Sequence, residues 1–73
     1  MTNTLYRHYK GGYYIVLGIA RLHDSWTDYV VYQETGTPAI WLRLFEDFYD
    51  QVQLADGSWV DRFNKVTGLD TDE

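Results

Sequence analysis

The sequence predicts one nearly all-β domain over residues 1–63, folded as a small, strongly bent antiparallel sheet of the SH3-like barrel type with about five strands. First, a chain of 73 residues has room for only one core. Second, short apolar and aromatic segments alternate with turn residues. Third, 3 Trp, 7 Tyr and 3 Phe supply large buried surfaces in a chain that has no Cys to form disulfides.

The first two strands are expected over residues 5–10 and 13–22, with Gly11-Gly12 between them as a turn that accepts positive φ. The second strand is apolar on both faces, whereas a strand buried on one face alternates with polar residues. We therefore expect a bulge or bend at Gly18, which lets the two halves of the strand turn different faces inward.

The middle of the chain predicts two further strands, over residues 28–33 and 39–43. The turn residues 35–38 (Thr-Gly-Thr-Pro) separate them. Apolar residues then recur at helical spacing between residues 44 and 52, which predicts one short helical stretch of one or two turns.

The last third predicts a hairpin of strands over residues 51–55 and 58–63, joined by Asp56-Gly57. Residues 64–73 are polar and acidic, and we expect them to form a loosely ordered C-terminal tail. An OB-type barrel is the alternative architecture, but it normally uses a longer chain and a longer helix. We expect one core with these members: Val16, Leu17, Ala20, Val30, Tyr32, Leu42, Phe48 and Val52.

The charge balance disfavours nucleic acid as a partner. The net charge is −5, whereas nucleic-acid affinity depends mainly on Lys and Arg. Arg7, Lys10 and Arg21 in the first third leave a local basic face as an alternative. No apolar run is long enough to span a membrane and the first residues do not resemble a signal peptide, so we expect a cytoplasmic protein without a membrane partner, as a monomer or a weak dimer.

Several motifs resemble a family of small bacterial domains of unknown function (number 1653). The motifs, in order, are Tyr6-Arg7-His8-Tyr9-Lys10-Gly11-Gly12-Tyr13-Tyr14, Val16-Leu17-Gly18-Ile19-Ala20, Val30-Val31-Tyr32, Trp41-Leu42-Arg43, Phe48 with Val52, and Arg62-Phe63. The chain departs from the family pattern at Leu44 and Asp61, where a proline is usual. The resemblance implies a small β-barrel and no particular activity.

The sequence offers no constellation typical of an enzyme, and we expect no catalytic residues, no cofactor and no metal. Ser25 and Ser58 lie in predicted turns, where serine is common. The two histidines, His8 and His23, match no known metal-ligand spacing together with the nearby acids. Glu46 and Asp50 are spaced like a pair of catalytic carboxylates, but such a spacing is expected by chance in a chain with eleven acidic residues.

Two segments are candidate binding surfaces. In the first strand, alternation places Tyr6, His8 and Lys10 on one face and Arg7 and Tyr9 on the other. This arrangement is typical of single-strand nucleic-acid binding or of an edge strand protected by charge, and we favour the edge.

The second segment is Trp41-Leu42-Arg43. Here Arg43 is expected to be partly buried beside Trp41 and engaged by an acid. A structural pairing of Arg43 with Glu46 or Asp47 is the alternative to a binding role.

We therefore predict an uncharacterised, non-enzymatic binding module for an unidentified protein or peptide, because SH3-like barrels often present aromatic grooves to extended segments. A nucleic-acid accessory domain using the local basic and aromatic face is the alternative. The candidate binding residues are Tyr6, Arg7, Tyr9, Lys10, Trp26, Tyr32, Trp41 and Arg43.

Overall fold

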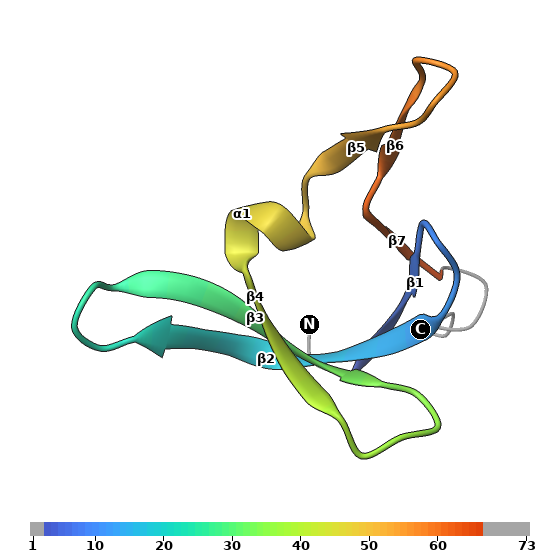
Figure 1. The fold of residues 1–73 in the computed structure, drawn as a ribbon. Coiled ribbons are helices and arrows are strands. Elements are labelled where there is room, and N and C mark those ends of the chain that lie inside the picture. The colour runs from blue at the N-terminus through green and yellow to red at the C-terminus, as the bar shows by residue number, and fades with distance from the viewer. Residues whose placement is uncertain (1–2, 67–73) are drawn as a thin grey trace.

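The computed structural model describes residues 3–66, which form seven strands and one short helix (Figure 1). The elements are β1 (Thr4–His8), β2 (Tyr13–Leu22), β3 (Thr27–Glu34), β4 (Ile40–Leu44), α1 (Phe45–Phe48), β5 (Gln51–Gln53), β6 (Trp59–Asp61) and β7 (Phe63–Lys65). The predicted all-β class with a single helical turn is confirmed. None of the helical structure within residues 3–66 has the length and apolarity required to span a bilayer.

Five strands form one bent antiparallel sheet in the order β4-β3-β2-β1-β7. Strands β5 and β6 form a separate antiparallel hairpin that stands away from this sheet (Figure 1). Within the described chain the main sheet has two edges, because β4 pairs only with β3 and β7 pairs only with β1. The predicted bent antiparallel sheet is confirmed, and its likeness to SH3-like barrels stays a prediction.

The expected irregularity in β2 lies beside Gly18. Val16 pairs with Tyr32 and Gly18 pairs with Val31, so Leu17 is the extra residue of a β-bulge. A bulge bends its strand and increases the local twist. The two halves of β2 therefore belong to differently oriented parts of one sheet, as the sequence predicts.

The hairpin turn at Asp56-Gly57 is also confirmed. Gly57 has a φ of 92°, in the left-handed region, and its N–H donates to the carbonyl of Leu54 at 2.9 Å. The Asp56 carboxylate accepts hydrogen bonds from the backbone N–H of Ser58 at 2.9 Å and from its hydroxyl at 2.6 Å. This Asx-type arrangement fixes the turn locally.

The strand predicted over residues 58–63 is divided at Arg62 into two strands with different partners. Strand β6 pairs with β5, whereas β7 pairs with β1. Strand β7 continues within the main sheet to Lys65, two residues beyond the predicted boundary at residue 63. The rest of the predicted tail, residues 67–73, lies outside the described residues.

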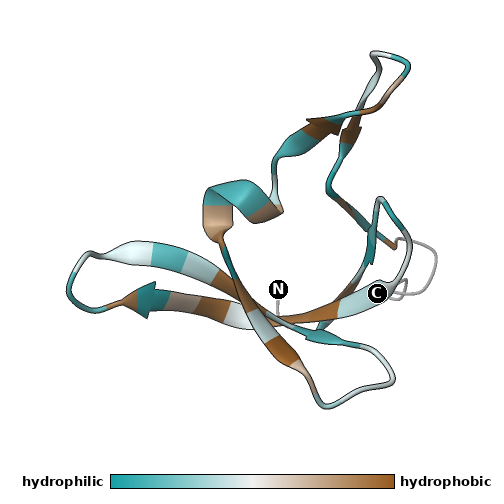
Figure 2. Cartoon of the chain, in the orientation of Figure 1, coloured by the Kyte–Doolittle hydropathy of each residue, from teal (hydrophilic) through white to brown (hydrophobic). Residues whose placement is uncertain are grey.

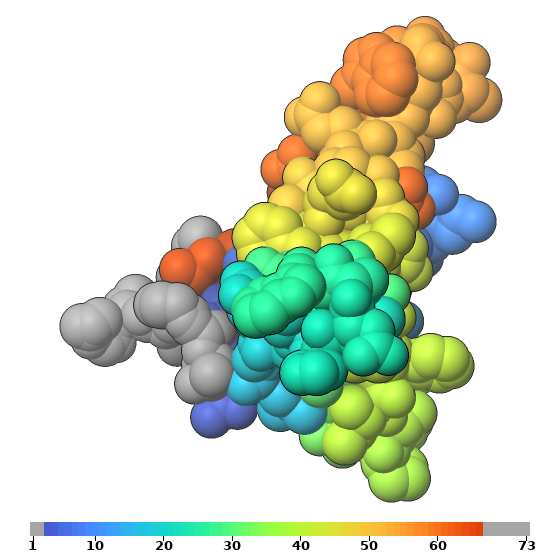
Figure 3. Space-filling model, turned by 90° about the vertical axis from the view of Figure 1, so that its left-hand side faces the viewer, coloured from blue at the N-terminus to red at the C-terminus, as the bar shows by residue number. Residues whose placement is uncertain are grey.

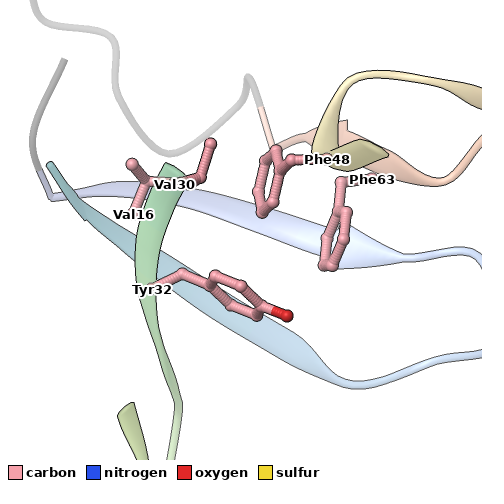
Figure 4. Close-up of a cluster of buried hydrophobic side chains, with 5 residues drawn as sticks. All are labelled: Val16, Val30, Tyr32, Phe48 and Phe63. Carbon is pink, nitrogen blue, oxygen red and sulfur yellow. The ribbon is translucent and has the colours of Figure 1, made fainter. Parts of the chain in front are cut away.

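The core is small and mostly aromatic. Figure 4 shows its members: Val16, Val30, Tyr32, Phe48 and Phe63. The rings of Phe48 and Phe63 stack with centroids 4.1 Å apart, and Tyr32 meets both edge-on. The prediction of Val16, Val30, Tyr32 and Phe48 is confirmed, whereas Phe63 was not predicted.

Leu42 was wrongly placed in the core. Its partner in β3 is Val31, whereas the buried Val30 and Tyr32 pair with Arg43 and Trp41. We call the sheet face that carries Val30 and Tyr32 the inner face and the opposite one the outer face. Paired residues share a face, so Leu42 lies on the outer face, where it is 62% exposed.

Three more predicted core positions are less buried than expected. Ala20 pairs with Tyr29, away from the inner face, and is exposed. Leu17 at the bulge and Val52 in the projecting hairpin are only half-buried. The bulge and the hairpin both carry their residues away from the aromatic centre, so these three contribute less to the core than the sequence predicted.

Candidate functional site

The edge strand β4 exposes three consecutive large apolar residues. Ile40 is 58%, Trp41 50% and Leu42 62% exposed. Trp41 lies on the inner face, and Ile40 and Leu42 lie on the outer face, because side chains alternate along a strand. Both faces of this edge therefore present apolar surface to solvent.

On the inner face, Trp41 and Arg43 lie side by side at the mouth of a shallow hollow. The hollow is lined by residues of β2, β3 and β4: Tyr14, Tyr32, Glu34, Trp41 and Arg43. The antiparallel register brings them together, since Tyr14 pairs with Glu34 and Tyr32 pairs with Trp41. The hollow thus combines aromatic rings with one acidic and one basic group.

The Arg43 guanidinium is half-buried, as predicted, but it is not held by an acid. Its Nε donates to the Tyr32 hydroxyl at 3.3 Å, and its Cζ lies 5.6 Å from the centre of the Phe63 ring. Within residues 3–66 it forms no ion pair with a carboxylate. The expected acidic partner is wrong because Tyr32, a diagonal neighbour across the β3–β4 ladder, places its hydroxyl within reach of Arg43.

Tyr32 was predicted both in the core and among the candidate binding residues. Its ring is buried, which confirms the first prediction. The hydroxyl is the part that reaches the hollow, where it holds Arg43. A buried tyrosine that presents only its polar end stabilises the site instead of contacting a partner with its ring.

The aromatic and basic surroundings of the inner face shift two titrating groups. Burial, followed by the charges of Arg43, Arg62 and Lys10, lowers the pKa of His8. Burial raises the pKa of Tyr14, with a further contribution from the nearby Glu34 carboxylate. Both groups are therefore neutral at neutral pH, and the charges of the hollow are those of Glu34 and Arg43.

A second hollow opens where β4 runs into α1. It is lined by Trp26, Thr27, Asp28, Leu44, Phe45 and Glu46. Trp26 is 70% exposed and has a φ of 59°, a conformation that costs a non-glycine residue about 1–3 kcal/mol. Arg21 lies 5.7 Å over its ring and bonds Asp28 at 2.7 Å. Aromatic rings and carboxylates therefore both line this hollow as well.

A third, apolar hollow lies on the outer face. Ala20, Arg21, Leu22, Tyr29 and Leu42 line it, so it continues the exposed surface of Ile40 and Leu42 across β3 to β2. An outer sheet face of this kind in a small protein normally carries polar residues. Its apolar lining makes it part of the candidate binding surface of β4.

The predicted basic edge strand is instead a central strand. Strand β1 pairs with β2 on one side and with β7 on the other, so the interpretation as a charge-protected edge is wrong. The ring of Tyr6 turns inward and meets Phe48 edge-on at 5.3 Å. Strand β7, which the sequence did not separate from β6, covers the side of β1 that was expected to be free.

The predicted basic residues do not assemble into one face. Arg7 pairs with Tyr13 at the start of β2, and Arg21 lies near the other end of this 10-residue strand, roughly 26 Å away along it. Lys10 lies in the β1–β2 turn, with its Nζ 5.8 Å from the ring of Tyr9. Lys10 and Tyr9 thus contact each other, and Arg7 is their near neighbour in sequence at the end of β1.

Sequence reasoning missed Trp59, which is 58% exposed on the projecting β5–β6 hairpin. The space-filling view in Figure 3 shows how far this hairpin extends from the rest of the molecule. Its strands carry hydrophobic residues, brown in Figure 2. A tryptophan immediately after the Asp56-Gly57 turn indicates an exposed ring, because a hairpin of three-residue strands has little to cover it.

The titratable residues considered for catalysis have structural or solvent-exposed positions. His23 and Asp24 form a 3.2 Å contact in the exposed β2–β3 loop. Asp50, considered with Glu46, accepts two hydrogen bonds from Arg62. Within residues 3–66, no three His, Asp or Glu side chains gather in a manner that suits a metal ion.

Comparisons with known proteins place the chain in one family. A family model described as "Protein of unknown function (DUF1653)" matches residues 4–65. The crystal structure of a protein belonging to DUF1653 from Bordetella bronchiseptica is similar with a TM-score of 0.74 and 31% identity, over 88% of this chain and 85% of that one. A search of curated proteins gives no match. The chain therefore belongs to the DUF1653 family of proteins of unknown function.

Proposed function

We propose that this domain is a non-enzymatic binding module that recognises a protein segment along β4. The observation that carries the proposal is that an exposed Trp41 and Arg43 lie on the same face of an edge strand. The other face of this strand exposes Ile40 and Leu42. Tryptophan and arginine are enriched among the residues that contribute most to protein–protein affinity.

The exposure of three adjacent apolar residues is itself costly. Single exposed apolar side chains are common on soluble proteins, but consecutive ones promote aggregation unless a partner covers them. Ile40, Trp41 and Leu42 form such a run. Burial of one large apolar side chain contributes about 1.5–3 kcal/mol, so a partner that covers these three gains a substantial part of its affinity from them.

The shape of the surface supports recognition of a macromolecule over turnover of a small molecule. The three hollows have volumes of about 220, 210 and 280 Å³, whereas small-molecule pockets usually enclose about 300–1,000 Å³. Shallow hollows beside an edge strand suit the side chains of an extended segment. A chain without Cys suits a cytoplasmic location, which forms part of the proposal.

A nucleic-acid accessory role is the second candidate, and Arg7, Tyr9 and Lys10 are the residues that favour it. They lie together at the end of β1, with Lys10 close to the Tyr9 ring. Two cations and one ring make a small surface in a chain of net charge −5, and the third cation considered, Arg21, is bonded to Asp28. Because phosphate neutralisation dominates nucleic-acid affinity, we place this role second.

An NMR titration tests the proposal. Amide and indole signals of the labelled domain are followed during addition of a library of extended peptides and, separately, of single-stranded oligonucleotides. We expect peptides to shift Trp41 and its neighbours, and Trp41→Ala to abolish those shifts. Trp59→Ala is the matched control, since Trp59 is more than half exposed but lies on the projecting hairpin.

Two results would contradict this proposal. Shifts confined to Arg7, Tyr9 and Lys10 with oligonucleotide, weakening steeply with salt, would favour the nucleic-acid role. Peptide binding that survives Trp41→Ala but is lost in Trp59→Ala would move the site to the β5–β6 hairpin.

A further inference from the structure

We propose that the partner binds by adding a strand to the open edge of β4, and that this partner is an extended, cationic segment of another protein. The inference deepens the proposed function and depends on it. In such strand addition, backbone hydrogen bonds supply affinity and alternate side chains supply specificity.

The backbone of β4 offers the hydrogen-bonding groups that strand addition needs. The N–H of Glu34 donates to the carbonyl of Ala39 at 3.1 Å, which sets the phase of the β3–β4 ladder. Hydrogen-bonded pairs alternate with non-hydrogen-bonded pairs in an antiparallel ladder, so Trp41 and Arg43 direct their backbone groups toward β3. The N–H and carbonyl groups of Ile40 and Leu42 therefore face the open edge.

This edge lacks the usual protection against pairing. Natural edge strands are blocked by proline, by exposed lysine, by bulges or by an inward-pointing charge that another strand would bury. Strand β4 has the sequence Ile-Trp-Leu-Arg-Leu and a regular register. Its one charge, Arg43, already has the Tyr32 hydroxyl and the Phe63 ring as partners, so an incoming strand leaves it satisfied.

The charges near the two ends of β4 favour a basic partner segment. Glu34 lies beside Ala39 at one end of β4, and Glu46 and Asp47 follow its other end in α1. Among the described residues none of these three carboxylates forms an ion pair. A basic segment complements them, whereas a second copy of this chain, with its net charge of −5, is repelled.

The hollow beside Leu44 supports the same choice. Phe45 contributes an aromatic ring and Glu46 contributes a carboxylate, a combination that suits a lysine or arginine side chain, whereas Trp26 and Asp28 already bind Arg21. A strand that runs along β4 reaches this hollow at the Leu44 end of the edge. One of its cationic side chains can therefore enter the hollow.

The two faces of β4 predict the pattern of the bound segment. Alternate residues of an added strand meet Trp41 and Arg43 on the inner face, with Glu34 one strand further away in β3, and the remaining ones meet Ile40 and Leu42 on the outer face. The inner position beside Trp41 favours a basic side chain, which can stack on the indole and extend toward Glu34, and the outer positions favour aliphatic ones. The probe that follows is an acetylated peptide of about eight residues, alternating lysine and valine.

Hydrogen exchange in the intact domain gives the direct test. In the free domain we expect fast exchange at the Ile40 and Leu42 amides and slow exchange at the Trp41 and Arg43 amides, because only the latter face β3. Saturating Lys/Val peptide is expected to slow exchange at Leu42 by about tenfold or more. The same peptide with glutamate in place of lysine, or with a central proline, is expected to leave Leu42 unprotected.

A matched pair of variants at Leu42 distinguishes the contribution of its backbone N–H to binding from that of its side chain. Leu42→Pro removes the outward N–H but leaves the bonds to β3, since proline is tolerated on the open side of an edge strand. Leu42→Ala removes the side chain and keeps the N–H. We expect Leu42→Pro to weaken binding of the Lys/Val peptide at least tenfold, and more than Leu42→Ala does.

The outcomes distinguish this inference from the proposed function. If peptides shift Trp41 while exchange at Leu42 is unchanged in the wild-type domain, strand addition is wrong and recognition at Trp41 stands. If Leu42 becomes protected with rising domain concentration and no peptide, the occupant is a second copy. If the Lys/Val peptide perturbs neither Trp41 nor Leu42, the inference is overturned; the peptide library then decides the proposed function by itself.

Discussion

Arg62 holds Asp50 through both its side chain and its backbone. The guanidinium donates to the two carboxylate oxygens at 2.6 and 3.1 Å, and the Arg62 N–H donates to the Asp50 carbonyl at 3.0 Å. Asp50 lies between α1 and β5, and Arg62 lies between β6 and β7. The pair therefore closes the base of the projecting hairpin, and the Arg62 hydrogen bonds lower the pKa of the Asp50 carboxyl.

Replacing Arg62 by lysine should loosen the hairpin. Lysine keeps the charge but lacks the planar fork that bonds both oxygens of Asp50. We expect a melting temperature lowered by a few degrees and faster amide exchange in β5 and β6. Arg7→Lys, at an exposed position of β1, is the control and should leave both quantities unchanged. Equal effects of the two substitutions would show that the hairpin is held by other contacts.

The aromatic stack in the core predicts a strong contrast between two phenylalanines of α1. Phe48 is fully buried against Phe63, whereas Phe45 is half-exposed. Phe48→Ala should lower the free energy of unfolding by about 3–5 kcal/mol, because it leaves a cavity in a small core. Phe45→Ala should cost about 1 kcal/mol or less. Chemical denaturation of both variants measures the difference, and similar losses would contradict the assigned core.

Some local features of this fold were predictable because glycine favours particular backbone conformations, such as turns and bulges. The bulge beside Gly18 and the turn at Asp56-Gly57 follow from residues that favour those conformations by themselves. The aromatic core at Tyr32 and Phe48 was predictable for a different reason, since a chain without disulfides needs some of its large aromatic residues to form a core.

Register and strand order were not predictable in the same way. Shifting a strand by one residue exchanges its two faces, so the sequence alone could not decide between Leu42 and its neighbours Trp41 and Arg43 for the inner face. The central place of β1 depends on pairing with β7, which is distant in sequence. The candidate site was therefore found in part: Trp41 and Arg43 were predicted, but the open edge that they occupy was not.

Tyr49 should be the last tyrosine to ionise among those whose pKa is raised. Partial burial, a hydrogen bond with Tyr6 and the nearby Tyr6 phenol raise its pKa to about 12. The folded state therefore retains this proton above pH 10, and the stability that it contributes is present below about pH 10 and lost as the pH rises toward 12. An alkaline titration in which phenolate absorbance is recorded measures the pKa of Tyr49.

The matched variant for this titration is Tyr6→Phe. It keeps the ring that packs on Phe48 and removes the hydroxyl next to Tyr49. We expect the highest phenolate pKa to fall in this variant while the core stays packed. An unchanged titration curve would show that the Tyr6 hydroxyl does not bear on Tyr49.

His8 makes the domain less stable in mild acid. The N–H of Lys10 donates to Nδ1 of His8 at 3.2 Å, so in the neutral ring the proton is on Nε2. The ring meets Phe63 edge-on at 4.9 Å, and burial together with the charges of Arg43, Arg62 and Lys10 lowers the His8 pKa from its usual 6.5. Protonation would remove the hydrogen bond from Lys10 and add a like charge beside these cations.

The direction of the pH effect follows from this lowered pKa. The unfolded chain takes up a proton at about pH 6.5, before the folded domain does. The stability linked to His8 is therefore complete above pH 6.5 and is lost as the pH falls through the lower pKa of the folded state. Melting curves at a series of pH values should show a decline that begins below pH 6.5.

Two asparagine substitutions isolate the contribution of His8. His8→Asn keeps a hydrogen-bond acceptor near the Lys10 N–H and removes the titrating ring, so the decline in melting temperature below pH 6.5 should become shallower. His23→Asn, in the exposed β2–β3 loop, should retain the wild-type decline. A wild-type pH profile in His8→Asn would place the acid sensitivity in another group, and the Asp50 carboxylate paired with Arg62 would then be the next to test.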